Sequence, residues 1–484
     1  MATIAEIDGL SVPPLIDGFT FAINTSLGDG TATFHLPLSG AVNFTVDWGD
    51  GSSDTITSDT DPAMDHSYSS GGTYDVTLDG TIGTWNTGTV TDRPKVTDVK
   101  KWSTNFLLGN FNSFSGLTSD TATDYPSVSN FNVFFRSCAA YNGDISNWNV
   151  STVTSMEEMF SGASSFNQNL NTWTTTQLGS IQEIFRNASS FNQPINNWDV
   201  SGVTNMSYAF RDASSFNQSL NSWNVSSVSL MRDMFYGASS FNGDITGWTT
   251  TSLTQVLNMF RNATSFNQDL NGWDVSGVNS FAYMFDGATV FNRSLNSWNM
   301  TGSLNLTSMF RNTAMDGNIT SWNVSTVTGF SNMFNNTPFN QNISGWNVGA
   351  GVDFQEMFRD CTSFNQPIGS WNVANATNMS EMLRGASTFN RDCGGWVLSS
   401  ANSVSGVRYC FEGSGMSAAN VSATIIGWES NAPATGVDAT QCFGNITMSI
   451  ATYGTAKAAY DNLILAVGSG GYGWNLTSAI NWVP

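Results

Sequence analysis

Tryptophan recurs at a nearly fixed interval over more than half of this chain. Successive tryptophans are 24 or 25 residues apart. The series comprises Trp148, Trp173, Trp198, Trp223, Trp248, Trp273, Trp298, Trp322, Trp346, Trp371 and Trp396. A period of this length indicates one supersecondary unit per repeat, stacked so that each unit completes the core of its neighbours. The repeat therefore predicts a solenoid, and it favours a long surface over an enclosed active site as the functional part.

The residues between two tryptophans predict what one coil contains. In the unit that begins at Trp198, four apolar residues follow the spacing of one buried helix face: Val203, Met206, Phe210 and Ala213. The segment 216–225 is rich in Asn and β-formers, which is typical of a strand followed by a turn. We therefore expect a short strand plus a short helix or 3₁₀ segment per 25-residue coil, as in leucine-rich-repeat folds.

The charge balance excludes several classes of partner. The 484 residues contain 16 Lys+Arg against 37 Asp+Glu, a net charge of −21. Such a chain is poorly suited to nucleic acid and to anionic membrane surfaces. It has no apolar run long enough for membrane insertion. Residues 1–30 lack the basic start and apolar block of a secretion signal. We expect either release without a signal, as for virion components freed on lysis, or a signal removed by processing, and the initial Met1 favours the first.

Cysteine and asparagine occupy fixed repeat positions. The five cysteines fall on small or apolar positions of the repeat: Cys138, Cys361, Cys393, Cys410 and Cys442. We therefore expect core thiols rather than disulfides. An asparagine follows the repeating phenylalanine in ten units, from Asn142 to Asn390. Its amide suits hydrogen bonding to the turning backbone of adjacent coils, and a ladder of ligand-binding amides is the alternative.

Arginine also recurs, directly after another repeating phenylalanine or leucine. The stripe comprises Arg136, Arg186, Arg211, Arg261, Arg311, Arg359 and Arg384. One interpretation is a solvated face, paired in part with Asp212 or Asp360, because exposed charges are usually solvated. The other is a binding track for anionic glycans or a partner subunit. Both interpretations stay open at the level of the sequence.

The repeat resembles the BspA-like leucine-rich repeat of bacterial surface proteins. The resemblance is carried by runs such as WDVSGVTNMSYAFRDASSFNQSLNSW, which begins at Trp198. A related form places Cys three residues after Phe, as in Phe135-Cys138 and Phe358-Cys361. The resemblance covers residues 128–445. It implies a right-handed solenoid used on cell surfaces and in viral proteins for adhesion or host contact, with no catalytic residues.

The two ends of the chain differ from the repeats. Residues 31–102 resemble a PKD-type all-β sandwich, on the segment WGDG at Trp48 and the later segments HSY and GTY. Its aspartates Asp47, Asp50, Asp54 and Asp65 are candidate Ca²⁺ ligands, and tight turns built from Asp and Gly are the alternative that we favour. We expect an N-terminal arm over 1–30, a transition over 103–127 and a helical cap over 446–484. One helical face of that cap is marked by Ala456, Ala459, Tyr460, Leu463 and Val467, with Gly468 ending the helix.

No pattern in the chain points to catalysis or to a cofactor. The two histidines, His35 and His66, lie outside the repeats, and Glu157, Glu158, Glu183, Glu356 and Glu381 look scattered. The sequence favours a non-enzymatic protein of a virion or extracellular surface. Our first hypothesis is a phage-like fibre, spike or decoration protein that contacts a host surface or other capsid components. A bacterial cell-surface adhesin is the second, and a filament or matrix subunit is the third. Its partner would be a protein or glycan, and an oligomer stays possible.

Overall fold

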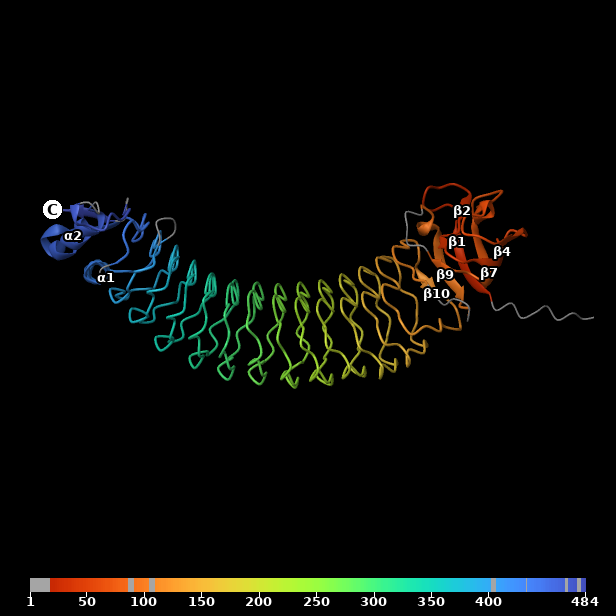
Figure 1. The fold of residues 1–484 in the computed structure, drawn as a ribbon, viewed down its shortest axis with the longest axis horizontal. Helices are drawn as coiled ribbons and strands as arrows, with labels where there is room; N and C mark the ends of the chain where they lie inside the picture. Colours follow the sequence, from red (N-terminus) through yellow and green to blue (C-terminus); the bar gives the residue numbers. More distant parts are fainter. Residues whose placement is uncertain are drawn as a thin grey trace, which may run out of the picture. The chain divides into compact units, whose positions relative to one another are not determined.

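The computed structural model describes residues 18–85, 91–103, 109–401, 406–431, 433–465, 469–476 and 480–484 (Figure 1). The chain forms two compact units. The first unit comprises Met1–Leu178 and Ala188–Gln193, and the second comprises Gly179–Asn187 and Pro194–Pro484. No helix among the described residues combines the length and the hydropathy of a membrane span.

A six-stranded sheet forms the early part of the first unit. Its strands lie in the order β10-β9-β1-β7-β4-β5, and all neighbours are antiparallel except β9 and β10. They are β1 (Phe19–Asn24), β4 (Asn43–Asp47), β5 (Ser53–Ile56), β7 (Thr73–Thr81), β9 (Val96–Lys101) and β10 (Ser119–Asp120). Two small ladders join β2 (Thr33–His35) to β6 (Asp65–Ser67) and β3 (Leu38–Ser39) to β8 (Thr84–Trp85). The 3₁₀ helices η1 (Pro62–Met64) and η2 (Arg93–Lys95) precede β6 and β9.

The sheet begins earlier and ends later in the chain than the sequence predicts. Strand β1 lies within the expected arm, residues 1–30, yet it pairs with both β7 and β9 in the middle of the sheet. Its Phe19, Phe21 and Ile23 are fully buried, because alternate side chains of a strand point to the same face. Strand β10 lies in the expected transition segment 103–127. The expected boundaries 31–102 therefore enclose most of this sheet but not all of it.

Successive repeats stack as coils that hydrogen-bond through their backbones. Parallel β-bridges join equivalent residues of neighbouring coils, for example Asn205 to Leu230 and Leu230 to Gln255. Between β10 and α1 (Ala418–Ser430) the described residues form no helix and no strand longer than such a bridge. The predicted short helix or 3₁₀ segment in each coil is therefore wrong, and the expected strand is reduced to a single bridge.

The turns of each coil explain why no helix forms. Backbone N–H groups donate alternately within a coil and to the next one: Arg211 donates to the Tyr208 carbonyl (3.1 Å), whereas Tyr208 donates to that of Arg232 (2.9 Å). A helix would direct all of these bonds along its own axis. Tyr208 (φ 61°) and Asp212 (φ 57°) also adopt left-handed backbone, which ends a right-handed turn. The apolar spacing that predicts a helix thus arises from a series of turns.

The second left-handed position of each coil has its own sequence signature. It is occupied by Ser137, Gly162, Asn187, Asp212, Gly237, Asn262, Gly287, Asn312, Asn336, Asp360, Gly385 and Gly413. Glycine adopts this conformation without a Cβ penalty, and Asn and Asp tolerate it better than other residues. The requirement for a left-handed residue explains why so few residue types occur at this position.

Aromatic ladders fill the interior of the coils. In the second unit, Trp248 and Trp273 stack with ring centres 5.8 Å apart. The Trp248 Nε1 donates to the Leu220 carbonyl of the preceding coil (2.8 Å). Phe235 and Phe260 stack in another ladder, 5.6 Å apart. Each ring contacts its equivalents in the neighbouring coils, and Phe235 also stacks on Phe241 of its own coil (3.9 Å), so burial and coil stacking depend on each other.

The recurring asparagine has the structural role that the sequence favours. The Asn242 side-chain carbonyl accepts a hydrogen bond from the Asn267 backbone N–H (2.9 Å), and Asn267 does the same for Asn292 (3.0 Å). In a coil shortened by one residue, Asp316 takes this position and accepts from Asn340 (2.9 Å). These bonds hold the turn of each coil against the next.

All five cysteines are buried and unbonded to one another, as predicted. The Cys361 thiol donates to the Phe334 carbonyl (2.7 Å). Burial raises the pKa of Cys138 and of Cys361 to about 12. These residues therefore act as small core side chains.

The end of the second unit is helical. Helix α2 (Ile450–Ile464) lies between β11 (Ile446–Ser449) and β12 (Ile480–Val483), which pair in parallel. It corresponds to the helix expected within 446–484, and it buries Ala456, Ala459 and Leu463. The expected positions Val467 and Gly468 lie outside the described residues. Helix α1 begins within the long interval between Trp396 and Trp428 and ends two residues after Trp428.

Candidate functional site

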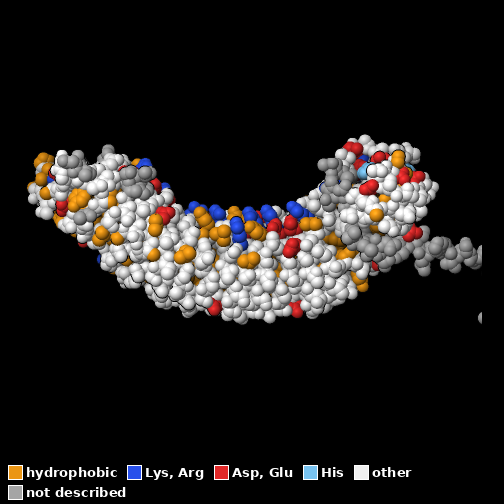
Figure 2. Space-filling view, in the orientation of Figure 1, with side chains coloured by type: hydrophobic (Ala, Val, Ile, Leu, Met, Phe, Trp, Pro, Cys, Tyr) orange, Lys and Arg blue, Asp and Glu red, His pale blue; other side chains and the backbone are white. Residues whose placement is uncertain are grey.

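Most arginines of this chain lie on one edge of their coils. Nine of the twelve occupy two repeat positions that are four residues apart: Arg136, Arg186, Arg211, Arg232, Arg261, Arg311, Arg359, Arg384 and Arg408. We call this set the arginine edge; Arg136 belongs to the first unit and the other eight to the second. Figure 2 shows Lys and Arg side chains gathered along one margin of the coils. Seven of the nine form the predicted stripe, whereas Arg232 and Arg408 were not predicted.

Every arginine of the predicted stripe pairs with a carboxylate. The N–O distances are 3.1 Å for Arg136–Glu158, 2.7 Å for Arg186–Glu183, 3.3 Å for Arg211–Asp212, 3.0 Å for Arg261–Asp286, 2.8 Å for Arg311–Asp286, 2.9 Å for Arg359–Glu381 and 2.9 Å for Arg384–Glu381. Of the two acids named from the sequence, Asp212 pairs with Arg211 and Asp360 lies 3.5 Å from Arg359. The glutamates that look scattered in the sequence mostly meet on this edge.

Two carboxylates behind the arginines are almost fully buried. The Asp233 and Asp286 side chains are 4% and 3% exposed. Each pairs with two arginines: Asp233 with Arg211 (3.8 Å) and Arg232 (3.0 Å), and Asp286 with Arg261 (3.0 Å) and Arg311 (2.8 Å). Arg311 donates through both Nε and Nη2, and this pairing raises the pKa of Arg311. A buried carboxylate with two guanidinium partners fixes the orientation of both.

Tyrosine rings lie between these guanidinium groups. The centre of the Tyr236 ring is 4.6 Å from the guanidinium carbon of Arg211 and 5.8 Å from that of Arg261. Arg261 also lies 4.9 Å from the Tyr283 ring, and Arg211 lies 5.7 Å from the Tyr208 ring. Cation–π attraction at such distances holds each guanidinium plane in place. Sequence reasoning missed these tyrosines because their positions hold different residues in other coils.

The candidate Ca²⁺ ligands Asp47 and Asp50 bind the turn that follows β4. The Asp47 carboxylate accepts the Gly49 backbone N–H (2.9 Å). The Asp50 carboxylate accepts the backbone N–H (2.9 Å) and hydroxyl (2.5 Å) of Ser52, and it also lies 2.9 Å from the His66 Nε2. The bond from the Ser52 hydroxyl, followed by that from His66, lowers the pKa of Asp50 to about 2. Both carboxylates therefore have local partners in the turn.

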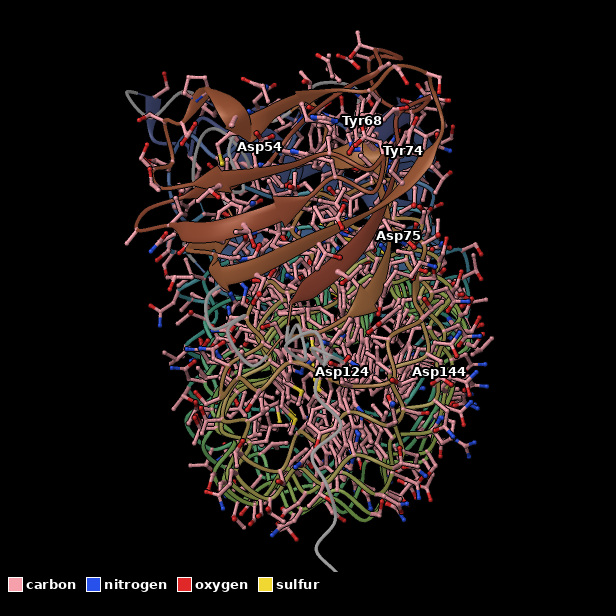
Figure 3. The ribbon with its side chains drawn as sticks, turned by 90° about the vertical axis from the view of Figure 1, so that its right-hand side faces the viewer. Asp54, Tyr68, Tyr74, Asp75, Asp124 and Asp144 are labelled. Carbon is pink, nitrogen blue, oxygen red and sulfur yellow. The ribbon has the colours of Figure 1, made fainter. Side chains whose placement is uncertain are left out.

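The other two candidate ligands, Asp54 and Asp65, have separate partners. Asp54, labelled in Figure 3, accepts the Trp48 Nε1–H (2.8 Å). Asp65 lies 2.8 Å from the Nδ1 of His35. Among the described residues, no group of three or more His, Cys, Asp or Glu side chains is arranged to hold a metal ion. Each of the four aspartates is thus engaged with a different part of the sheet and its turns.

Three overlapping segments of the chain match one known protein family. The segments are residues 105–223, 204–315 and 304–423, and the family is described as "Mycoplasma protein of unknown function, DUF285". Together they span more than half of the chain. The chain belongs to the DUF285 family. No curated protein matches it.

The DUF285 segments contain the whole arginine edge. The match confirms a tandem family of surface-type repeats, which the sequence predicts for this part of the chain. The four candidate aspartates and strands β1 to β9 lie ahead of the DUF285 segments. The PKD-like character of the sheet therefore stays a prediction.

Proposed function

We propose that this protein is a non-enzymatic structural and adhesion protein of an exterior surface. In this proposal the DUF285 coils form a rigid solenoid, closed by its helical end, and the arginine edge is its binding surface. The six-stranded sheet acts as a PKD-like spacer or attachment module. The partner is a protein or glycan of a host or cell surface, or another component of the same particle.

The placement of the arginines carries this proposal. The chain has only 16 Lys+Arg, yet eight arginines lie on one edge of the coils of the second unit. Arginine and tyrosine are enriched among the residues that dominate binding energy at interfaces. Side chains that are already held in place lose little conformational freedom on binding. Each of these arginines contacts a carboxylate or a tyrosine ring, so the edge is suited to recognition.

Two locations fit a scaffold of this kind. The first is a virion, in which the chain is a phage-like fibre, spike or decoration protein. The second is a bacterial cell surface, on which the chain is an adhesin. The description of the matched family, which names Mycoplasma proteins, favours the second location.

Labelled antibody on thin sections of virions and of producing cells tests the location. Label on particles supports the first location, and label on the cell envelope supports the second. Label confined to the cell interior contradicts both. Light scattering of the purified protein separates a monomeric binder from a filament subunit.

Adhesion is tested by binding the purified protein to intact host or producer cells. Arg359→Gln combined with Arg384→Gln should weaken binding, because both arginines belong to the edge. The matched control is Arg293→Gln, since the Arg293 Nε donates to the Asn267 carbonyl of the asparagine ladder (2.8 Å). Equal binding of all variants to cells would contradict the assignment of the arginine edge as the binding surface. Depolymerisation of host glycans by the protein would contradict its non-enzymatic character.

A further inference from the structure

One part of the arginine edge is assembled from alternating rings and guanidinium groups. We call it the tyrosine–arginine cluster, and it consists of Tyr208, Arg211, Arg232, Tyr236, Arg261 and Tyr283. Arg211, Tyr236 and Arg261 occupy the same position of three consecutive coils, so the ring lies between two cations. The buried carboxylates of Asp233 and Asp286 lie behind them. The cluster is therefore ordered without a ligand.

Two arginines of the cluster keep donors for a ligand. The Arg232 side chain is 47% exposed and that of Arg261 is 30% exposed. Each approaches its buried carboxylate through Nε, at 3.0 Å in both cases. Within the described part of the chain, the Nη1 and Nη2 groups of these two arginines have no hydrogen-bond partner. Two pairs of N–H donors thus remain, one coil apart.

We propose that the tyrosine–arginine cluster binds a linear carboxylated polysaccharide, a polyuronate, laid along the coils. This inference rests on the proposed binding role of the arginine edge. A guanidinium group matches a carboxylate with two parallel hydrogen bonds. The free Nη donors of Arg232 and Arg261 lie in consecutive coils, so a polymer with a carboxylate in each unit engages both at once, which raises its avidity.

Geometry rather than charge density determines the preferred ligand. The net charge of −21 repels any polyanion at long range. Asp233 and Asp286 also neutralise guanidinium charge from behind. Binding therefore depends on short-range hydrogen bonds to the Nη groups. A carboxylated chain is expected to bind more tightly than a sulfated chain of higher charge density.

Titration calorimetry of the full-length protein with oligogalacturonate of defined length tests this proposal. Fully methyl-esterified oligogalacturonate keeps the sugar backbone but lacks the carboxylates, and it should not bind. Dextran sulfate tests whether charge density alone determines binding. Polyglutamate tests whether carboxylates on a polypeptide bind as well as carboxylates on a polysaccharide. Oligogalacturonate is expected to bind most tightly of the four.

Arg232→Gln combined with Arg261→Gln removes the free Nη donors and leaves the buried carboxylates of Asp233 and Asp286 in place. In this variant Asp233 keeps Arg211 as a partner, and Asp286 keeps Arg311. The fold is therefore expected to persist, and thermal unfolding checks this directly. Loss of two charged donor groups should weaken oligogalacturonate binding about tenfold or more.

Arg293→Gln combined with Arg391→Gln is the matched control, because it removes two exposed arginines that bind the asparagine ladder. Arg293 donates to the Asn267 carbonyl (2.8 Å) and Arg391 to that of Asn365 (3.1 Å). This control should bind oligogalacturonate as the unmodified protein does.

Unchanged binding by the cluster variant, or tighter binding of dextran sulfate, would overturn the proposal. Tighter binding of polyglutamate would assign the cluster to an acidic protein partner and overturn it as well. If the protein adheres to cells or virions but binds no oligogalacturonate, the proposed function stands and the polyuronate inference fails. If it binds oligogalacturonate and labels no exterior surface, the proposed function fails instead.

Discussion

Asp120 should make the stability of the first unit depend on pH near neutrality. Its carboxyl group is buried and accepts hydrogen bonds from the Trp102 Nε1 (3.1 Å) and the Ala122 backbone N–H (3.1 Å). Burial, with a smaller contribution from the charge of Asp98, raises the pKa of Asp120 from 3.8 to about 7. On the neighbouring strand, Asp98 is itself paired with Lys100 (2.7 Å). Asp120 is thus a carboxyl group that the fold holds protonated in mildly acidic solution.

The raised pKa translates into a loss of stability as the pH rises. In the unfolded chain the Asp120 carboxyl ionises near its ordinary pKa of 3.8, whereas in the folded protein it ionises near 7. The unfolded state therefore binds fewer protons between these values, so the free energy of unfolding falls over this range. The contribution of Asp120 to the free energy of unfolding is fully present below about pH 4 and is lost by about pH 7. A shift of about three units corresponds to about 4 kcal/mol.

The Asp120→Asn variant isolates this effect, because an amide keeps a hydrogen-bond acceptor but does not titrate. Calorimetric unfolding of the full-length variant and the unmodified protein should be compared at pH 4 and pH 8. The amide has an NH2 group in place of one of the two accepting oxygens, so the variant should be less stable than the unmodified protein at pH 4. Between pH 4 and pH 8 the unmodified first unit should lose about 4 kcal/mol of its free energy of unfolding that the variant does not lose.

Asp144→Asn is the control for this experiment, since Asp144 is an exposed carboxylate of the same unit (Figure 3). In this control, the free energy of unfolding should change between pH 4 and pH 8 as much as it does in the unmodified protein. If Asp120→Asn also left it unchanged, burial would not be the cause of a raised pKa, and the reasoning would be refuted.

Three further experiments probe the coils themselves. Trp273→Ala removes a side chain that is 3% exposed and should lower the free energy of unfolding by about 3–5 kcal/mol in denaturant titration; a near-neutral effect would contradict a buried ladder. Gly237→Ala should lower the melting temperature, because its Cβ would lie 2.2 Å from the Asp212 carboxylate at a φ of +67°, whereas Gly272→Ala, which meets no atom within 4 Å, should not. The buried thiols, Cys361 among them, should react with a thiol reagent only as the protein unfolds, because burial raises their pKa; rapid reaction of the native protein would contradict this packing.

The period of the tryptophans was sufficient to predict the stacked repeat and its core. Trp273 and Phe260 recur because each coil needs an equivalent ring above and below, and this requirement is visible in one sequence. The left-handed turns were also visible in principle. Every coil has a Ser, Gly, Asn or Asp at the repeat position of Asp212 and Gly237. This restriction to residues that tolerate left-handed backbone distinguishes a turn from a helix. The apolar spacing alone does not, because both structures bury the same residues.

The strands and contacts that join distant parts of the chain were harder to predict. Strand β1 lies in the middle of the sheet because its partners β7 and β9 come much later in the chain, and such pairing leaves no local signal. The arginine stripe was predicted by its period, but the roles of Asp233 and Asp286 were not. Other coils have different residues at the positions of these two acids. Each acid meets its two arginines only because neighbouring coils stack on one another.

The hydrogen bonds between coils have a consequence for variants that gain or lose one complete repeat. Phe235 donates to the Met259 carbonyl of the next coil, and Phe260 donates to that of Met284 in the same way. Deleting or duplicating one complete repeat therefore recreates the same bonds across the junction. Such a change would alter the number of stacked coils in steps of one. The side chains of the edge differ between coils, so the same change would alter the tyrosine–arginine cluster according to which coil is lost or gained.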